Sequence, residues 1–190
     1  MAKRKRLVPG CLAGLLSVCI ISGVVLVVTG WWRHAKNVAV MPIRGQSLVN
    51  LSRSHPFTPP EGQGVSEERL LAYIEVCCRA KPAADALDRW EEAYEKEHGD
   101  RTHDAKIEGA GHAGAFMKEI AAALKEHDMG PTEFRWIGER MRRAEAASRE
   151  GAPPFDPSLA SDVALFERHA ERLAACSLSP HSLEIIHGFA

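Results

Sequence analysis

The chain has 190 residues, of which 45% are apolar and 26% charged, and its formal net charge is −1 at pH 7. The apolar content, the lack of a glycine repeat and a count of five Cys exclude disordered, collagen-like and disulfide-scaffold proteins. The length suits one compact domain with its own core and leaves little room for two.

Charge is divided unevenly along the chain. Residues 1–60 contain eight Lys and Arg and no acidic side chain, whereas residues 61–190 contain 16 basic and 25 acidic side chains. The small net charge therefore arises because the basic residues 1–60 and the acidic residues 61–190 cancel each other. Because the second part is acidic, we do not expect nucleic acid as a partner.

Residues 1–6 form a basic tail, and residues 7–32 follow it without one ionisable side chain other than Cys thiols. At about 1.5 Å per residue, a helix of this length crosses a hydrocarbon core of roughly 30 Å. Trp31 and Trp32 then fall in the far headgroup layer, where amphipathic rings prefer to lie. The pattern predicts a single transmembrane helix over residues 7–32, in contact with membrane lipid.

A cleaved signal peptide is the alternative interpretation of this segment. Its apolar stretch would be about 7 to 15 residues long and would end in small residues at the cleavage site. Here the stretch is longer, and Trp31 and Trp32 stand where the small residues are needed. We therefore favour a permanent anchor.

The positive charge next to the span predicts its orientation. Four basic residues precede the span directly, while Arg33, Lys36 and Arg44 are spread out after it. Because Lys and Arg are retained on the cytoplasmic side, we expect a cytoplasmic amino terminus in a bacterial inner membrane, with residues 33–190 in the periplasm.

Gly10 and Gly14 form a small-xxx-small pair within the span. Small residues at this spacing let two membrane helices approach closely, which predicts a membrane protein partner. The alternative is that glycine is simply common in membrane helices.

Residues 33–64 are rich in Pro and Gly and show no sustained period, which predicts a tether with a short extended piece at Val38 to Ile43. A basic tether of this kind gains energy near an anionic lipid surface.

From residue 65 to residue 190 the apolar residues recur with a helical period, and no run alternates as a strand would. Ser66 is a candidate cap for the first helix, and Gly130 with Pro131 predicts a left-handed stop after the third. Five amphipathic helices with short connections must bury their apolar stripes together, so we expect an all-α, antiparallel bundle. The first helix is expected to begin at Ser66 and to carry its apolar stripe from Leu70 to Cys78. The second is expected from about Pro82 to Gly99, and the others over about 113–127, 132–151 and 159–173.

The last segment, from Pro180 to Ala190, contains Leu183, Ile185, Ile186 and Phe189. It either docks on the bundle as a short helix or presents an apolar patch to another protein.

Gly109, Gly111 and Gly114 match the dinucleotide fingerprint G-x-G-x-x-G. That fingerprint requires a buried strand directly before it, and the preceding residues are polar. We therefore interpret the glycines as a hinge before the third helix.

Nine His is a high number for this length, and several of them lie between His98 and His127. Imidazole and carboxylate ligands in one loop would suit zinc, copper or nickel. The alternative is a polar surface loop with no cofactor. The candidate ligands are His98, Asp100, His103, Asp104 and His112.

Three thiols follow the membrane segment. In an oxidising compartment, Cys77 or Cys78 can bridge to Cys176 and tie the first helix to the end of the fifth. The alternative is that all three are small buried core residues. No C-x-x-C motif is present to indicate thioredoxin-like chemistry.

The stretch MGPTEFRWIGERMRRAEAA, residues 129–147, resembles a segment of uncharacterised bacterial envelope proteins that have one amino-terminal span and a small helical domain. The resemblance covers about 20 residues and implies an envelope location with a similar helical architecture. It implies no catalytic residues.

These patterns contain no nucleophile elbow, phosphate loop or paired carboxylates on a defined scaffold. We therefore expect a non-catalytic single-pass membrane protein, an accessory or scaffold subunit of a membrane protein complex. The alternative function is an extracytoplasmic metal-binding or metal-sensing module that uses the loop from His98 to His127. The sequence leaves the oligomeric state and the identity of the partner open.

Overall fold

A computed structural model describes residues 45–98, 103–150 and 156–189 of the chain. Every regular element within these ranges is a helix, and they contain no strand, so the all-α prediction is confirmed. A first helix covers residues 45–54. The later helices are α2 (Glu67–His98), α3 (His103–Glu126), α4 (Pro131–Glu150), α5 (Pro157–Ala175) and α6 (Pro180–His187).

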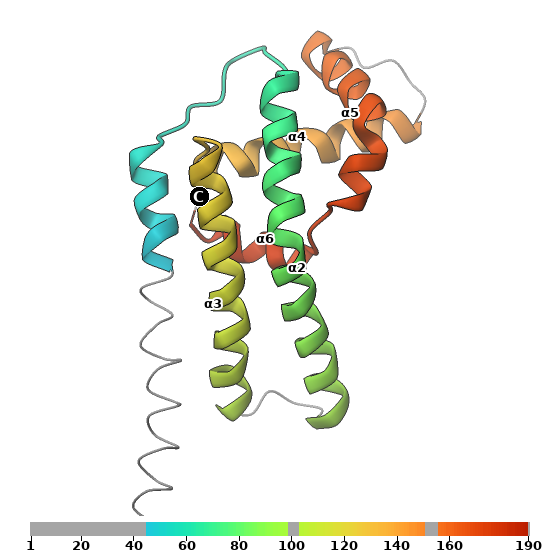
Figure 1. Cartoon of the computed structure of the whole chain (residues 1–190). Coiled ribbons are helices and arrows are strands. Elements are labelled where there is room, and N and C mark those ends of the chain that lie inside the picture. The colour runs from blue at the N-terminus through green and yellow to red at the C-terminus, as the bar shows by residue number, and fades with distance from the viewer. Residues whose placement is uncertain (1–44, 99–102, 151–155, 190) are drawn as a thin grey trace, which may run out of the picture.

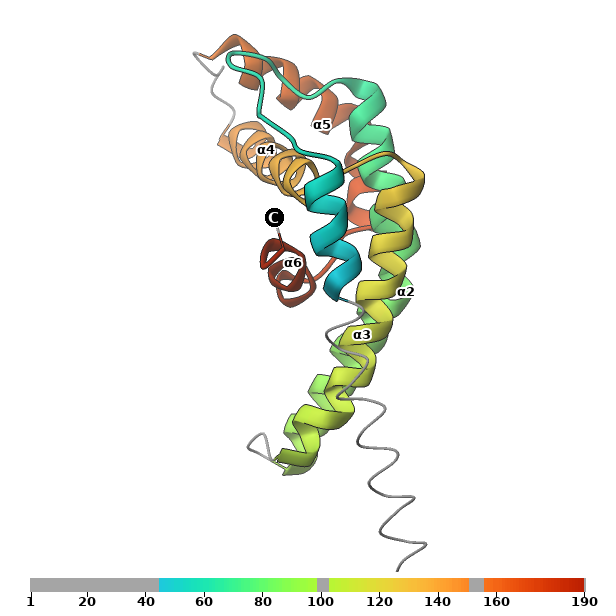
Figure 2. The ribbon, with the colours of Figure 1, turned by 90° about the vertical axis from the view of Figure 1, so that its left-hand side faces the viewer.

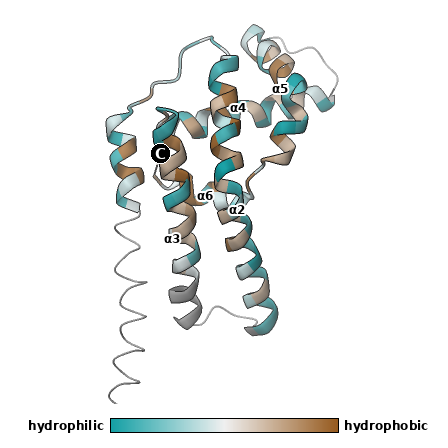
Figure 3. Cartoon of the chain, in the orientation of Figure 1, coloured by the Kyte–Doolittle hydropathy of each residue, from teal (hydrophilic) through white to brown (hydrophobic). Residues whose placement is uncertain are grey.

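The helices form a bundle built around a long hairpin (Figure 1). α2 and α3 run antiparallel, and helix 45–54 lies beside α3 (Figures 1 and 2). α4 and α6 run across the hairpin, and α5 packs on α4. The predicted helical bundle is thus confirmed. The antiparallel arrangement is seen in the hairpin of α2 and α3. Each helix carries both hydrophobic and hydrophilic residues, as expected for helices with one face in a core (Figure 3).

α2 is one helix of 32 residues, so the predicted break at Pro82 is wrong. Ser66 caps it as expected, since its Oγ accepts a hydrogen bond from the N–H of Arg69 at 3.3 Å. Pro82 has no N–H to bond the carbonyl four residues earlier, which disfavours a helix at this point. The flanking Ala80 and Ala84 are fully buried in the bundle, and this packing carries α2 through the proline.

α3 begins ten residues earlier than expected, and the glycine hinge is wrong. Gly109, Gly111 and Gly114 all lie inside the helix. The ring of Trp90 packs so closely on Gly109 that a Cβ there would lie 2.5 Å from it. The glycine therefore serves the contact between α2 and α3, not a bend.

The predicted tether differs most from the structure. Residues 45–54 are helical, with Leu48 fully buried and Leu51 buried in the core. Gly45 lies against the ring of Phe189, which a Cβ on Gly45 would approach to 3.2 Å. The helical domain therefore includes residues from 45 onward, twenty positions before its expected start.

α3 ends in the expected kind of stop, shifted by two residues. Asp128 adopts the left-handed conformation with φ 51°, the N–H of Asp128 bonds the carbonyl of Lys125, and that of Met129 bonds the carbonyl of Leu124. This is the Schellman pattern. Gly130 has another role, because a Cβ there would lie 2.5 Å from the carbonyl oxygen of His55.

None of the helices within the described ranges has both the length and the hydropathy that a bilayer span needs. The predicted span over residues 7–32, with Gly10, Gly14, Trp31 and Trp32, lies outside the described residues.

Candidate functional site

A groove of about 680 Å³ opens between α2, α4, α5 and α6. It lies where α6 and the end of α5 meet α2 and α4. Ligand pockets in proteins are commonly about 300–1,000 Å³, so the groove has the size of a binding site. Its apolar lining comes mainly from Phe134, Met141, Phe166, Leu173, Leu178 and Leu183.

Several of these apolar side chains remain partly open to solvent. Phe166, Leu173, Leu178 and Leu183 pack against the core while staying only partly buried. Such a concentration of accessible apolar surface in one hollow is typical of a site that another molecule covers.

α6 forms one wall of the groove, and contacts at both of its ends hold it in place. Ser179 caps it, accepting from the N–H of Ser182 at 3.1 Å and donating to Asp88 of α2 at 2.9 Å. Ile186 is fully buried, and Phe189 packs on Gly45. Of the two expected fates of the carboxyl-terminal segment, the structure has the docked short helix.

A disulfide bond between Cys78 and Cys176 joins α2 to the end of α5 beside the groove. Their Cα atoms are 4.5 Å apart, and 98 positions separate them in the sequence. This is one of the two pairings that the sequence left open. Cys176 also lines the groove, so the bond holds together two of its walls.

Cys77 is the third thiol, and it is free and buried in the groove floor beside Tyr73. Burial raises the pKa of the Cys77 thiol to about 12, although the hydrogen bond with Tyr73 acts in the opposite direction. Burial also raises the pKa of Tyr73 well above 10. Because the thiolate is the reactive form, Cys77 is a poor nucleophile and acts as a core residue.

The rim of the groove is charged. Glu139 pairs with Arg135 at 3.8 Å, and Glu145 pairs with Arg149 at 2.6 Å. Glu184 also lines the groove, and within the described ranges no ion pair engages it. The groove therefore combines an apolar floor with a polar edge, which suits an amphipathic partner.

His187 and Arg142 complete the rim. The pKa of His187 is lowered first by burial, then by Arg142 and Arg135, while Glu139 and Glu184 raise it by less. The imidazole therefore prefers its neutral form in the folded protein.

The buried ion pair between Arg140 and Asp162 fixes α4 against α5. Asp162 is fully buried and also accepts the N–H of Val65 at 2.8 Å, while Arg140 donates to Ser158 Oγ at 3.0 Å. A Cβ on Gly64 would lie 2.7 Å from the Asp162 carboxylate. Since this cluster is closed and internally satisfied, its role is structural.

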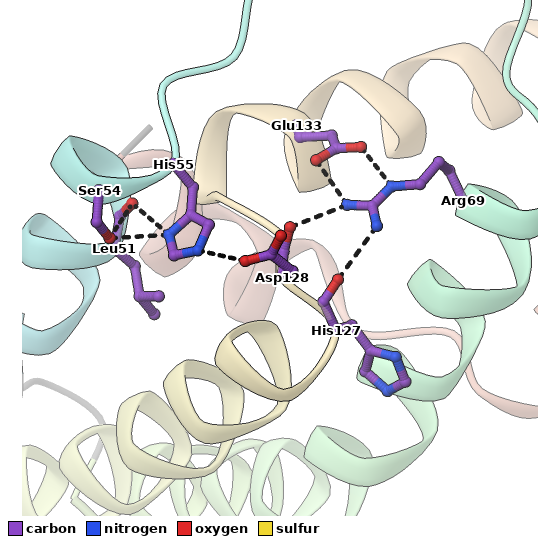
Figure 4. Close-up of polar contacts among 7 residues, drawn as sticks. All are labelled: Leu51, Ser54, His55, Arg69, His127, Asp128 and Glu133. Atoms are coloured by element: carbon purple, nitrogen blue, oxygen red, sulfur yellow. Dashed lines mark hydrogen bonds and ion pairs between the residues drawn. The ribbon is translucent and has the colours of Figure 1, made fainter.

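A second polar cluster joins α2 to the turn between α3 and α4 (Figure 4). Arg69 makes a two-pronged ion pair with Glu133, both N–O distances being 2.7 Å, and donates to the carbonyl oxygens of His127 and Asp128. His55 contacts the Asp128 carboxylate at 2.7 Å. The other ring nitrogen of His55 lies 2.8 Å from Ser54 Oγ. These contacts position the helix ends around the turn between α3 and α4.

The predicted metal loop receives no support from the described side chains, which contain no group of three or more candidate ligands. The ring of His112 stacks on Trp90 with centroids 5.6 Å apart. The side chains of His98, Asp100, His103 and Asp104 lie outside the described residues.

Sequence reasoning missed most of the groove. Helical periodicity places Phe134, Phe166 and Leu173 on apolar stripes, and it does not bring them together with the charged rim residues Glu139 and Arg142. The one signal that pointed toward the site was the apolar carboxyl-terminal segment, which supplies Leu183 and the α6 wall.

The chain matches no protein-family model, and neither curated proteins nor solved structures provide a significant match.

Proposed function

We propose that this chain is a non-catalytic accessory subunit of a membrane protein complex, anchored by residues 7–32, whose helical domain receives an apolar segment of a partner protein. The groove between α2, α4, α5 and α6 is the observation that carries the proposal. Its partly exposed Phe166, Leu173 and Leu183 offer apolar surface that a partner can bury, and its charged rim can orient the bound segment.

A location outside the cytoplasm fits the chemistry of the domain. Disulfide bonds persist in oxidising compartments such as the bacterial periplasm, and Cys78 and Cys176 form one. The basic residues before the anchor favour a cytoplasmic amino terminus. Both observations support placing residues 33–190 in the periplasm of an inner-membrane protein.

The groove also lacks a favourable catalytic group. Its thiol, Cys77, has a raised pKa, and burial lowers the pKa of His187 on the rim. A binding role therefore accounts for the site with fewer assumptions than an enzymatic one.

Site-specific photo-crosslinking in native membranes tests the proposal. A photoreactive amino acid replaces Ala174, an exposed residue that lines the groove, and in a matched control it replaces Ala122, an exposed residue of α3 away from the groove. We expect an adduct larger than the chain itself from position 174 and none from position 122. Equal adducts at the two positions, or no intermolecular adduct at position 174, would contradict a partner site in the groove.

The anchor is tested separately. Alkaline carbonate extraction is expected to leave the full-length chain in the membrane, and protease added to spheroplasts is expected to degrade residues 45–190. Recovery of a shortened, soluble chain would remove the anchor from the proposal while leaving the groove in place.

A further inference from the structure

The disulfide bond between Cys78 and Cys176 lies at the surface. Cys78 is exposed on α2, and Cys176, directly after α5, is only partly buried. Cys176 lines the groove, and both cysteines line a second, open hollow of about 370 Å³. Exposed disulfide bonds belong to the labile or regulatory class, whereas structural bonds resist reduction. A thiolate can therefore approach Cys78 Sγ while the domain stays folded.

Basic side chains surround the exposed sulfur. Lys81 and Arg89 line the same hollow as Cys78. Lys81 pairs with Asp85 at 3.0 Å, whereas no ion pair within the described ranges engages Arg89. Positive charge attracts an incoming thiolate and stabilises the thiolate that leaves, so it favours thiol–disulfide exchange at this bond.

The neighbouring thiol does not compete for this exchange. Cys77 is buried, and burial raises its pKa to about 12. Almost none of it is thiolate at neutral pH, so it does not attack the bond beside it. A reductant of the bond must therefore come from outside the chain.

The segment that the bond fixes is itself a wall of the groove. The connection from α5 to α6 passes beside α2 (Figure 1). Leu178 in this connection packs on the core and stays partly exposed. The groove is lined here by Cys176, Ser177, Leu178 and Pro180. Any movement of residues 176–180 away from α2 therefore changes the groove.

Without the bond, hydrogen bonds near the surface remain between this segment and α2. Lys81 donates to the carbonyl oxygen of Ser177 at 3.3 Å, and Ser179 donates to Asp88 at 2.9 Å. The net contribution of such single hydrogen bonds is small. At the other end of α6, Ile186 is fully buried. Loss of the bond therefore frees the beginning of α6 and leaves its end in the core.

We propose that the Cys78–Cys176 bond places the groove under redox control, and that a protein dithiol of the C-x-x-C class reduces it. A thiolate of that protein attacks Cys78 Sγ, the S–S bond breaks, and Cys176 leaves as a thiolate. The second thiolate of the C-x-x-C pair then attacks its own partner sulfur in the mixed disulfide and releases Cys78. Two electrons and the two protons of the dithiol pass to Cys78 and Cys176, and the dithiol becomes a disulfide.

Reduction then frees residues 176–180, and the groove loses this wall. We expect the reduced protein to bind a partner segment more weakly. Only this loss of binding rests on the proposed function, because the release of the wall follows from the contacts within the chain.

The first experiment measures access to the bond in the full-length Cys11→Ser, Cys19→Ser chain in nanodiscs. Dithiothreitol is expected to reduce the folded chain at a rate within about tenfold of the urea-unfolded chain, as counted by maleimide labelling. A thioredoxin variant that keeps only its attacking cysteine is expected to be trapped on Cys78. Reduction only in urea, or trapping only on Cys176, would overturn the proposal.

A charge change tests the approach through the hollow. Arg89→Glu is expected to slow the trapping of thioredoxin about two- to fivefold, because it replaces the positive charge beside Cys78. Arg143→Glu, at an exposed position of α4 that lines neither the groove nor the hollow, is the matched control. Equal rates for the two variants would contradict the assigned approach.

Amide hydrogen exchange measures the release of the wall. After reduction, peptides that cover residues 176–183 are expected to exchange at least about tenfold faster, while α3 peptides around Ile120 keep their rate. A Cys78→Ser, Cys176→Ser variant should show the fast exchange with or without reductant. An unchanged rate at residues 176–183, or an equal increase around Ile120, would show that the bond does not control this wall.

Photo-crosslinking from Ala174 in native membranes separates this proposal from the proposed function. Reduction is expected to lower the yield of the intermolecular adduct at least about fivefold. Faster exchange at residues 176–183 with no adduct in either redox state would retain the redox control and remove the partner. An adduct whose yield ignores reduction would retain the partner and contradict redox control of the groove.

Discussion

Replacing Asp162 with Ala removes a carboxylate that several buried groups depend on. The carboxylate is fully buried, pairs with Arg140 and accepts the N–H of Val65 at 2.8 Å. Removing it leaves the guanidinium of Arg140, which is only 12% exposed, without its anion. It also leaves the N–H of Val65 without a partner and opens a space beside Gly64.

The expected cost follows from these contacts. Removing one partner of a buried ion pair typically costs about 3–5 kcal/mol because the remaining charge stays desolvated. The same substitution leaves the backbone N–H of Val65 unpaired, which alone typically costs about 1–3 kcal/mol. Because both costs arise from removing one carboxylate, we do not add them in full. Since a domain is stable by about 5–15 kcal/mol, Asp162→Ala should lower the urea midpoint greatly or prevent folding.

Urea unfolding followed by circular dichroism at neutral pH measures this loss. Glu171→Ala, at an exposed position of the same helix, is the matched control and should change stability by less than about 0.5 kcal/mol. Arg140→Ala and the double variant complete a cycle, and the double change should cost clearly less than the two single changes combined. A loss below about 1 kcal/mol for Asp162→Ala, or strictly additive costs, would refute the structural role of the pair.

Three further changes test other parts of the molecule. Replacing Cys78 and Cys176 with Ser should lower the free energy of unfolding by about 2–5 kcal/mol, because the bond closes a long loop. Denaturant unfolding of the oxidised and the reduced protein measures the same loss, and equal stability of the two would contradict it. In a Cys11→Ser, Cys19→Ser background, Cys77 is the free thiol to be labelled, and a pKa of about 12 leaves little of it as thiolate. Cys77 should therefore react with maleimide about 1,000-fold more slowly than an ordinary thiol in the folded protein, and normally once urea is added. Rapid labelling of the folded protein would show that the thiol is accessible. The lowered pKa of His187 means that the unfolded chain binds a proton at higher pH than the folded chain. Stability is therefore lost as the pH falls below the ordinary histidine pKa of about 6.5. His187→Gln should make the loss of stability with falling pH shallower, and an unchanged slope would argue against the shift.

The site shows the limit of sequence reasoning most clearly. Helical periodicity identifies Phe134 and Phe166 as apolar positions on their helices, because one face of each helix must be buried. It does not say that Phe134 is fully buried while Phe166 stays partly open in a groove. That difference depends on how α6 meets α4 and α5, which are contacts between distant parts of the chain.

The helix ends give a similar result. The sequence indicated a stop near Gly130, and α3 does end there, but Asp128 adopts the left-handed conformation. Gly130 is required for a reason that no local pattern records, because the carbonyl oxygen of His55 approaches it from a segment more than seventy residues earlier.

The sequence by itself determined the helical class, the bounds of α4 and α5 to within a few residues, and the cap at Ser66, because hydrophobic period and capping act over one or two turns. Only the tertiary structure decided that α2 continues through Pro82, that residues 45–54 belong to the domain, and that Cys78 rather than Cys77 bonds Cys176. These outcomes depend on burial against partners far away in the chain, and the packing energy there exceeds the local preferences that a sequence pattern reports.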